Sequence, residues 1–515
     1  MHLFESLVAI LLLALLLLVA ARRLDLPYPT LLATGGVGFA LLPQAPEITV
    51  EPDLALALFI APALLHAAYH SSLRGLKRYW FALVALAVFA VLLTAAAVAF
   101  VGAWWAGLPL AAAFALGAIV APPDAAAADA VLSEVGVPRR GMLVLQGESL
   151  LNDATALLLF GLAVALATNT DTPATPWMLA AAVPGGILFG LVVAWVYLRL
   201  IGLFAGTLGS TLVDFVVTFA IWLAAERLHL SAVLAVVAFG LAIAQARPRT
   251  QPARDRLQTS AVWAAAVLVL NVVAFLLMGL QAKHLIVRLP PAERLAAIGF
   301  GLVVLATVLA VRLLWVALLR AIEGWIARRF APAWLPEPPP WSASLILGWS
   351  GMRGLVTLAA AFALPANFPG RDLILLAAFC VVLGTLLIQG TTLGPLIRWL
   401  GLDGDARFAE KVGETRDRLI RVALATLGER SDPAAAALRV RYEAAGHVVA
   451  HSDDPQAPSR FDELHLEMIA RQREALHDMR RSGAVAEDVY RRLQEEIDWA
   501  EVDARAFAEN ILRPA

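Results

Sequence analysis

The chain has little charge and almost no cysteine. Only 16% of its 515 residues are charged and 60% are hydrophobic, whereas soluble domains are about 25% charged and about 45–50% apolar. These proportions exclude an ordinary soluble protein and predict a membrane protein with several spans. The single cysteine, Cys380, lies in an apolar run, which excludes a disulfide framework and a cysteine zinc site. The net charge of −1 favours no particular partner, and we expect no nucleic acid.

Two motifs that would change this interpretation are also missing. No segment has the G-x-x-x-x-G-K-[ST] spacing of a nucleotide-binding loop, which disfavours ATP-driven transport. The first apolar run, 7–21, is preceded by no basic region, and its positive charges, Arg22 and Arg23, follow it. A cleaved signal peptide has the opposite order, so we expect a retained first span with the N-terminus outside the cell.

Apolar segments recur from Leu3 to about Leu400, and we interpret thirteen of them as membrane-spanning helices. Several are shorter than the roughly 20 residues that cross the hydrocarbon region directly. The predicted fold class is an all-α polytopic membrane protein, with a transmembrane domain at 1–402 and a small cytoplasmic helical domain at 403–515. The expected spans lie near 4–21, 30–43, 53–70, 79–103, 109–132, 141–168, 177–201, 211–227, 231–246, 260–282, 294–321, 341–365 and 371–400.

Basic residues are concentrated in alternate loops between these spans. Three intervening loops, 43–52, 102–109 and 168–176, contain no Lys or Arg. Because cytoplasmic loops carry an excess of positive charge, the pattern predicts a multi-pass protein of the cell (inner) membrane with a cytoplasmic C-terminus. One loop departs from the pattern, since it carries three basic residues on the predicted outer side: Lys283, Arg288 and Arg294.

Two predicted spans are interrupted by residues that a continuous helix disfavours. Near 121–124 the sequence reads Ala-Pro-Pro-Asp, and each proline removes a helical hydrogen bond. Near 348–354 it reads Gly-Trp-Ser-Gly-Met-Arg-Gly, with three glycines and a buried arginine. Non-helical backbone at membrane depth is tolerated only against protein or a water-filled cavity, and paired breaks point to the substrate site of a transporter. The alternative is a pair of kinked packing helices.

The stretch 146–155, Gln-Gly-Glu-Ser-Leu-Leu-Asn-Asp-Ala-Thr, places two acids in an apolar helix. A carboxylate inside a bilayer marks an ion or proton pathway by default. Burial disfavours its charged form, so protons compete with a cation for it, and alternate exposure of such a site exchanges one for the other. We expect Asp153 and Asp124 to bind the ion and the proton. Ser149 and a carbonyl freed at the proline break, that of Pro123, are expected to supply further oxygen ligands.

Spacing divides this stretch into two strips. Glu148 and Asn152 are four residues apart, as are Ser149 and Asp153, so each pair shares a helix face. We expect Ser149 and Asp153 to face the ion, and Glu148 and Asn152 to support the structure. Arg353 is the expected counter-charge for Glu148, because an unpaired arginine at that depth is costly. An alternative is that Glu148, Asp153 and Arg353 form one static network.

Three further acids lie in or near the spans. Asp129 follows Asp124 by five residues, so we expect it to face solvent or to pair with Arg139; a direct role as an ion ligand is the alternative. Asp214 and Glu226 are expected near span ends, where solvation is the default.

From about Asp403 the composition becomes that of a soluble helical segment. It has no catalytic signature, and we interpret it as regulatory or dimer-supporting. Its histidines, at 447, 451, 465 and 477, either sense pH or lie on the solvated surface. Helices are expected near 407–430, 432–449, 461–481 and 484–507.

Five motifs, in order along residues 5–402, resemble those of the NhaP-like, NHE-related sodium/proton antiporters of the monovalent cation:proton antiporter superfamily. As a set they are specific, because each occurs in the right order and in the right kind of segment. They lie at 26–29 (entry to the second span), 121–124 (first crossed helix), 147–153 (the Asn-Asp signature), 348–354 (the segment with the family arginine) and 384–393 (the last span).

The resemblance implies a fold of inverted repeats with two crossed, broken helices, the NhaA-like antiporter fold, and a homodimer. Asp153 would be the carrier that alternates between cation and proton, with Asp124 as its partner and Ser149 as a ligand. Na⁺ and H⁺ would then be transported ions, and no cofactor is expected.

Asn152 bears on the stoichiometry, because relatives with a second aspartate there are electrogenic. The asparagine therefore implies electroneutral, one-for-one exchange, with Glu148 and Arg353 as the buried pair that supports it. In the third span many relatives place an acid where this chain has His66. His66 either tunes the pH response or the choice among Na⁺, Li⁺ and K⁺, or forms a hydrogen bond between helices.

These features predict a secondary active transporter and not an enzyme. It would exchange Na⁺ or Li⁺ for H⁺ across the membrane and so serve pH homeostasis; K⁺/H⁺ exchange by the same fold is the nearest alternative. An intramembrane aspartyl protease using Asp124 and Asp153 is disfavoured, since no Gly-x-Gly-Asp motif occurs in a span. A cation channel is a further alternative, although broken helices and a buried ion pair favour alternating access.

Overall fold

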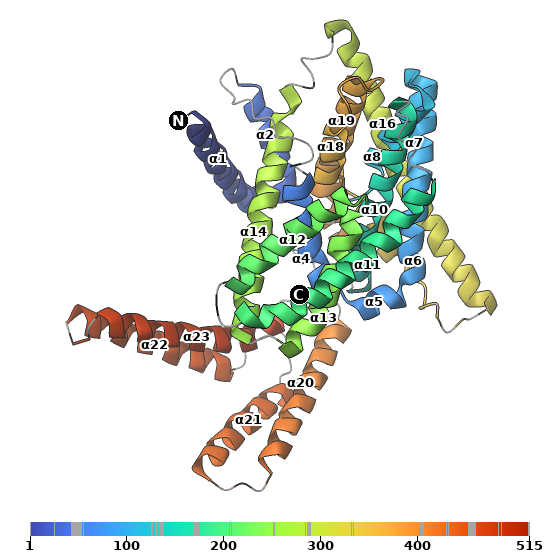
Figure 1. Cartoon of the computed structure of the whole chain (residues 1–515). Coiled ribbons are helices and arrows are strands. Elements are labelled where there is room, and N and C mark those ends of the chain that lie inside the picture. Colours follow the sequence, from blue (N-terminus) through green and yellow to red (C-terminus); the bar gives the residue numbers. More distant parts are fainter. Residues whose placement is uncertain are drawn as a thin grey trace. The chain divides into compact units, whose positions relative to one another are not determined.

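All regular structure in the described part of the chain is helical (Figure 1). The chain divides into two compact units, Met1–Asp403 and Gly404–Ala515, one residue from the expected domain boundary. The all-α class predicted from the sequence is therefore confirmed. The computed structural model describes residues 2–24, 26–42, 54, 56–124, 127–128, 132, 139–168, 176–204, 207, 209–250, 253–283, 285, 290, 291–330, 332, 334–401, 406–428, 430, 432–451, 460–482, 484–485 and 487–512.

The described part of the first unit is a succession of helices. Two π-helical segments, η1 and η2, and one 3₁₀ segment, η3, adjoin α-helices. In chain order the elements are α1 (His2–Leu24), α2 (Tyr28–Ala40), η1 (Leu56–Ile60), α4 (Ala61–His70), α5 (Leu73–Arg78), α6 (Trp80–Val84), η2 (Ala85–Ala90), α7 (Val91–Ala106), α8 (Leu110–Val120), α10 (Arg139–Thr168), α11 (Pro176–Leu200), η3 (Ile201–Phe204), α12 (Gly209–Arg227), α13 (Ala232–Thr250), α14 (Ala253–Leu280), α16 (Pro291–Phe330), α17 (Trp341–Trp349), α18 (Leu355–Phe362) and α19 (Arg371–Trp399).

Seven helical stretches of the described residues are long and apolar enough to cross a membrane. Three shorter apolar helices, Leu56–His70, Leu110–Val120 and Ala232–Arg247, lie among them. The protein is therefore a multi-pass membrane protein. The seven stretches are Trp80–Ala106, Arg140–Thr168, Ala181–Phe204, Gly209–Arg227, Asp255–Leu280, Pro291–Phe330 and Arg371–Trp399.

The two interruptions expected from the sequence are present and touch each other. Helix α8 ends at Val120, directly before the two prolines, and α17 ends at Trp349, before a non-helical segment that leads into α18. The amide of Asp124 donates to the carbonyl of Met352 across 2.7 Å. One break thus satisfies part of the polar backbone that the other exposes, as membrane depth requires. This mutual pairing goes beyond two separately kinked helices.

Small residues let several helices of this unit approach closely. A Cβ on Gly279 of α14 would overlap the Ala33 carbonyl of α2, and one on Gly190 of α11 would overlap the Ala235 carbonyl of α13. Membrane helices associate through such contacts, because lipid supplies no hydrophobic force between them. The sequence therefore encodes its helix pairs partly through where it places glycine.

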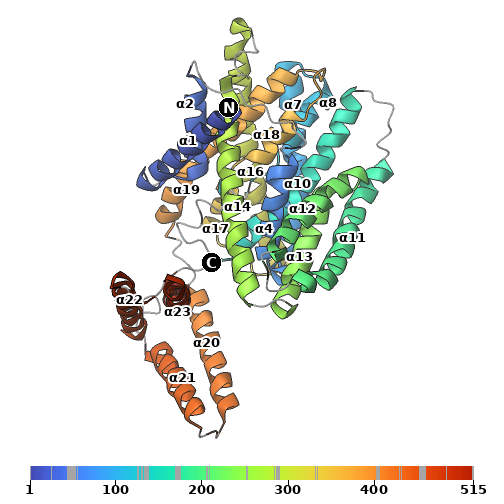
Figure 2. The ribbon, with the colours of Figure 1, turned by 60° about the vertical axis from the view of Figure 1, so that its left-hand side comes forward.

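Helix α10 runs between two buried apolar clusters. The first joins α2, α8, α14, α16 and α19, and it includes Leu145 and Ala163 of α10. The second joins α4, α11, α12 and α13, and it includes Leu150 and Ala154 of α10. Figure 2 shows α4 beside α10, α12, α13 and α14, in agreement with the packing of these helices. The acidic stretch of α10 is therefore enclosed by helices on both sides.

The second unit consists, in its described part, of α20 (Ala406–Leu427), α21 (Pro433–His451), α22 (Arg460–Arg481) and α23 (Glu487–Leu512). Helix α20 packs against α21, and α22 packs against α23. Arg473 of α22 forms ion pairs with Asp498 and Glu501 of α23. The ring of His477 hydrogen-bonds to the Tyr490 hydroxyl across 3.0 Å. This histidine therefore has a partner within the unit instead of being only solvated.

Candidate functional site

The acids and the amide of the 146–155 stretch are buried on α10. Glu148 is 1% exposed, Asn152 0% and Asp153 5%. Each interrupts an otherwise apolar helix surface, so each requires a partner or a function. Their partners differ, and these differences define the site.

Asp124 lies at the N-terminus of α18. Its Oδ2 accepts a hydrogen bond from the Leu355 amide across 3.2 Å. The first amides of a helix have no partner within the helix and carry a partial positive charge, so they favour an anion there. A Cβ on Gly354 would overlap the Asp124 carboxylate. Glycine at this position is therefore a condition for the contact.

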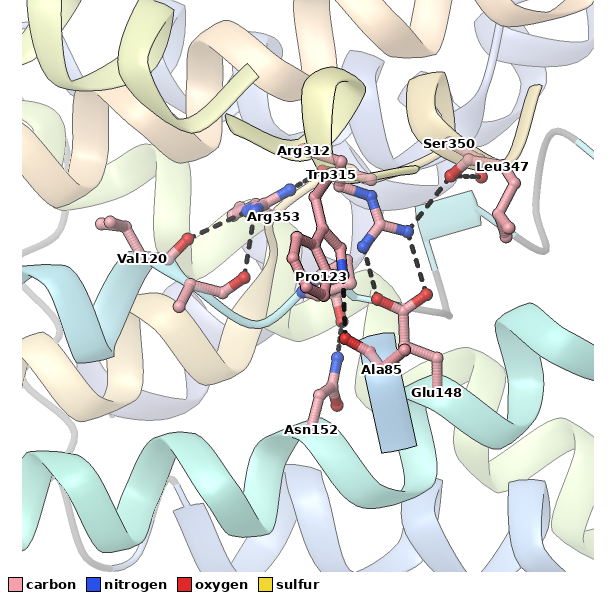
Figure 3. Close-up of polar contacts among 12 residues, drawn as sticks. Ala85, Val120, Pro123, Glu148, Asn152, Arg312, Trp315, Leu347, Ser350 and Arg353 are labelled. Atoms are coloured by element: carbon pink, nitrogen blue, oxygen red, sulfur yellow. Dashed lines mark hydrogen bonds and ion pairs between the residues drawn. The ribbon is translucent and has the colours of Figure 1, made fainter. Parts of the chain in front are cut away.

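Arg353 binds the carbonyl end of the other broken helix (Figure 3). Its Nε donates to the Val120 carbonyl and its Nη2 to the Ala121 carbonyl, each across 3.0 Å. Its Nη1 donates to the Gly351 carbonyl. The last carbonyls of a helix carry a partial negative charge, and the prolines after α8 leave them without further helix to pair with. The buried arginine thus satisfies backbone carbonyls that the interruption of the helix exposes.

Glu148 pairs with Arg312 of α16, and not with Arg353 as the sequence led us to expect. Both carboxylate oxygens are bound: Oε2 accepts from Nη2 of Arg312 across 2.9 Å, and Oε1 accepts from Nη1. Arg312 also donates to the Leu347 carbonyl across 3.1 Å. A planar guanidinium suits this two-point contact. Arg353 lies close enough to feel the charges of both partners, but its own donors go to backbone carbonyls.

Arg312 is the site residue that sequence reasoning missed. It is buried near the middle of the long apolar helix α16. The signal was present, because an arginine within the predicted span 294–321 is as costly as one at the break. Arg353 was the expected partner because it lies in the glycine-rich interruption at 348–354. The expected static network of Glu148, Asp153 and Arg353 is likewise absent from the hydrogen bonds and ion pairs of the described residues.

Asn152 connects α10 to the first break. Its Nδ2 donates to the Pro123 carbonyl across 3.1 Å (Figure 3). Its Oδ1 is buried and has no hydrogen-bond partner among the described residues. A carbonyl oxygen has two lone pairs, so Pro123 retains acceptor capacity. The support role expected for Asn152 is consistent with this geometry.

Asp153 lies near Asp124, and the charge of Asp124 acts on it. Within the described chain, no hydrogen bond or ion pair holds the Asp153 carboxylate, in contrast to Glu148 one turn earlier. Ser149 is half-buried on the same strip. Thr357, in the first turn of α18, is buried, and its hydroxyl has no partner among the described residues. Asp153, Asp124 and Ser149 thus offer carboxylate and hydroxyl oxygens, a donor set suited to a hard cation.

His66 lies on α4 and is half-buried. Its ring contacts that of His70, with the centroids 4.3 Å apart. No hydrogen bond within the described part of the chain joins His66 to Asp124 or Asp153, so the structure does not unite it with the carboxylates. Helix α4 does pack against α10 through the cluster that contains Leu65 and Leu150.

One expectation for the peripheral acids is wrong. Asp214 is buried, where we expected it to be solvated: it forms an ion pair with Arg247 of α13 and accepts a hydrogen bond from the Tyr197 hydroxyl of α11. Glu226 is exposed, as expected, and accepts from the Trp222 indole across 2.7 Å. Asp129 lies outside the described residues.

A bundle of membrane helices with two interrupted helices that meet beside buried carboxylates defines a secondary transporter. The sequence model of the family described as "Sodium/hydrogen exchanger, transmembrane" matches residues 8–399. The chain belongs to this family. It is accordingly a membrane antiporter and not an enzyme, and it works with transported ions and no cofactor. The family resemblance drawn from the sequence motifs is confirmed.

Known relatives agree with this assignment. A Mycobacterium tuberculosis protein described as an uncharacterized Na⁺/H⁺ exchanger is 30% identical over 94% of this chain and 93% of its own length. A sodium, potassium, lithium and rubidium/H⁺ antiporter of Bacillus pumilus is 31% identical over 78% of this chain and 62% of its own. The solved structure of the sodium proton antiporter MjNhaP1 from Methanocaldococcus jannaschii matches with a TM-score of 0.61 at 20% identity, covering 78% of this chain and 99% of that one. That likeness confirms the fold.

Proposed function

We propose that this antiporter exchanges Na⁺ for H⁺ and that Asp153 carries either ion in turn. The observation that carries the proposal is the environment of Asp153, a buried carboxylate near Asp124 that has no hydrogen-bonding or ion-pair partner among the described residues. A carboxylate in this setting is stable when it binds a proton or a cation, and the two compete for it. Alternate exposure of the site to the two sides then yields exchange.

The surrounding groups divide into ligands and supports. Asp124, Ser149 and the remaining lone pair of the Pro123 carbonyl are the proposed further ligands of the cation. Asn152 positions that carbonyl through its amide. The Glu148–Arg312 pair joins α10 to α16, and Arg353 secures the end of α8. These contacts fix the two breaks relative to α10, which preorganises the ligands.

The charge count supports electroneutral, one-for-one exchange. Glu148 and Arg312 neutralise each other, and Asn152 contributes no charge. Asp153 then releases one proton for each monovalent cation that it binds. In this proposal Asp124 stays ionised at the N-terminus of α18, where the Leu355 amide binds it, and α10 offers no second carboxylate beside Asp153, so no extra proton is carried per cycle.

Exchange of K⁺ for H⁺ is the second candidate, with Li⁺ as a further substrate. The Bacillus pumilus relative is described as a sodium, potassium, lithium and rubidium/H⁺ antiporter, and His66 stands where the resemblance leads us to expect an acid. Losing one anionic ligand weakens the preference for a small, strongly hydrated cation. A broad selectivity among monovalent cations follows from this arrangement.

We further propose thirteen spans arranged as inverted repeats, in a homodimer of the inner membrane that contributes to pH homeostasis. The N-terminus would lie outside and the C-terminus in the cytoplasm. The alternating basic loops support this orientation.

The direct test is cation-driven collapse of a pH gradient in everted membrane vesicles, measured with Na⁺, Li⁺ and K⁺ in turn. Asp153→Asn is expected to abolish the response to all three cations. Glu226→Gln, which removes an exposed acid of α12, serves as the matched control and should behave as the unmodified protein. Retained exchange in Asp153→Asn vesicles would refute the carrier assignment.

A further inference from the structure

His66 and His70 form a pair on one face of α4, and the proposed exchange mechanism assigns neither ring as a ligand of the transported ion. They are four residues apart on the helix, the spacing at which side chains stack one turn above another. Their ring centroids lie 4.3 Å apart with the planes inclined at 49°. Two histidines with this spacing on one helix face are a recurrent zinc-binding arrangement.

The hydrogen bond within the pair leaves a ring nitrogen free to bind a metal. Nδ1 of His70 lies 2.9 Å from the His66 carbonyl oxygen. A carbonyl accepts only, so Nδ1 carries the proton and Nε2 keeps its lone pair. Metal-binding histidines commonly donate their other nitrogen to a backbone carbonyl in this way, which fixes the tautomer and the ring orientation. No partner within the described chain engages the His66 ring nitrogens.

The pair lies at an accessible end of the helix. His70 is exposed and His66 half-buried. Helix α4 ends there, and after Ser71 and Ser72 the chain enters α5, which carries Lys77 and Arg78 in its last turn. Basic residues of this kind are concentrated where a membrane protein meets the aqueous phase. Because His70 is exposed at this end of the helix, water and a dissolved cation have access to its ring.

The charged groups near the pair are already engaged with each other, so the two histidines are the available metal ligands. Tyr69 packs edge-on against His70, and the guanidinium of Arg247 lies over the Tyr69 ring at 5.2 Å from its centroid. Arg247 is itself paired with Asp214. No group of three or more His, Cys, Asp or Glu side chains among the described residues is arranged to hold a metal. Within the described part of the chain, a metal bound here thus has two protein ligands and completes its coordination with water.

We propose that His66 and His70 bind a divalent cation of the Zn²⁺ type and that its binding slows ion exchange. Imidazole nitrogens suit Zn²⁺ and Cu²⁺, and Zn²⁺ accepts a tetrahedral set of two histidines and two waters. Helix α4 shares the apolar cluster of α10 through Leu65 and Leu150, three residues before Asp153. A metal that bridges one turn of α4 and adds positive charge there restrains a helix that packs directly against the proposed carrier helix α10.

Metal binding is tested first, without reference to transport. Purified protein in detergent is titrated with ZnCl₂ by calorimetry, and one equivalent of Cu²⁺ is examined by pulsed EPR, which detects the remote nitrogens of coordinated imidazoles. We expect one Zn²⁺ site and two imidazoles on Cu²⁺. His66→Gln and His70→Gln should each weaken Zn²⁺ binding at least tenfold, whereas His465→Gln, a control in the tail, should not. Absence of binding, or binding that neither variant weakens, overturns the site.

Inhibition, which rests on the proposed exchange function, is measured next in vesicles. Zn²⁺ should slow cation-driven proton movement in the unmodified protein, and His70→Gln should require at least tenfold more Zn²⁺ for the same fractional effect, each rate being normalised to its own zinc-free value. Binding without inhibition refutes the regulatory part. A protein that binds Zn²⁺ through both histidines yet exchanges no monovalent cation refutes the proposed function and leaves the metal site standing.

Discussion

The side-chain amide of Asn152 donates to the Pro123 carbonyl, so a residue of α10 directly supports the break after α8. A neutral amide can make this bond because it offers a donor, whereas an ionised carboxylate offers acceptors only. In the proposed mechanism the same residue also limits the charge of the site. A substitution at this position therefore tests stability and stoichiometry together.

Asn152→Asp is therefore expected to alter both properties. The lost bond, with a carboxylate facing a carbonyl, should cost about 1–3 kcal/mol of stability. Exchange in proteoliposomes should become dependent on an imposed membrane potential, because a second carboxylate adds a proton to each cycle. The exchange rate of the unmodified protein should be independent of the membrane potential. Potential-dependent exchange by the unmodified protein would contradict one-for-one coupling.

The Glu148–Arg312 pair should show strong energetic coupling. Glu148→Gln leaves a buried guanidinium without its counter-charge, which typically costs about 3–5 kcal/mol. Combining Glu148→Gln with Arg312→Met should recover much of that loss, as read from thermal unfolding in detergent. The same cycle with Arg353→Met is the comparison and should give weaker coupling, because Arg353 feels the charge of Glu148 but donates to backbone carbonyls. Stronger coupling of Glu148 to Arg353 than to Arg312 would restore the pairing expected from the sequence.

Gly354→Ala should impair cation binding through Asp124. The added Cβ overlaps the Asp124 carboxylate, which must leave the N-terminus of α18. We expect the KM for Na⁺ to rise about tenfold, the equivalent of 1.4 kcal/mol. Gly299→Ala on α16, where a Cβ meets no neighbouring atom, is the matched control. Equal kinetics for the two variants would show that the Asp124 contact is dispensable.

Thr357, two residues after the amide that binds Asp124, provides a test of whether the proposed cation site includes α18. Its buried hydroxyl lacks a protein partner among the described residues, so Thr357→Val should be neutral or stabilising. If the hydroxyl faces the cation, the same substitution should raise the KM for Na⁺ several-fold. Thr357→Ser keeps the hydroxyl and should preserve the KM. An unchanged KM in the valine variant would exclude Thr357 from the cation site.

Local features of the sequence predicted where the two helices are interrupted. The ion-pair partners of the buried acids depended on how helices far apart in the chain pack together. Single prolines lie inside α11 and α19 (Pro184 and Pro395), but the consecutive pair Pro122–Pro123 removes two helical amides and disfavours the helical conformation at Pro122, so the end of α8 was predictable from two residues. The partner of Glu148 was not, because Arg312 and Arg353 are equally plausible counter-charges until α16 and the second break are placed in space. Asp214 illustrates the same limit, since its partners Tyr197 and Arg247 come from two other helices.

The sequence by itself determined the membrane class, the two interruptions, the acidic stretch of α10 and the exchanger family. Each of these depends on composition, on local backbone chemistry or on a short ordered set of motifs. Only the tertiary structure decided that Arg312 neutralises Glu148, that Arg353 binds the carbonyl end of α8, that Asp124 caps α18 and that His66 meets His70 rather than the carboxylates. These contacts depend on the relative position of helices far apart in the chain, because a buried charge pairs with whichever group the packing brings within reach.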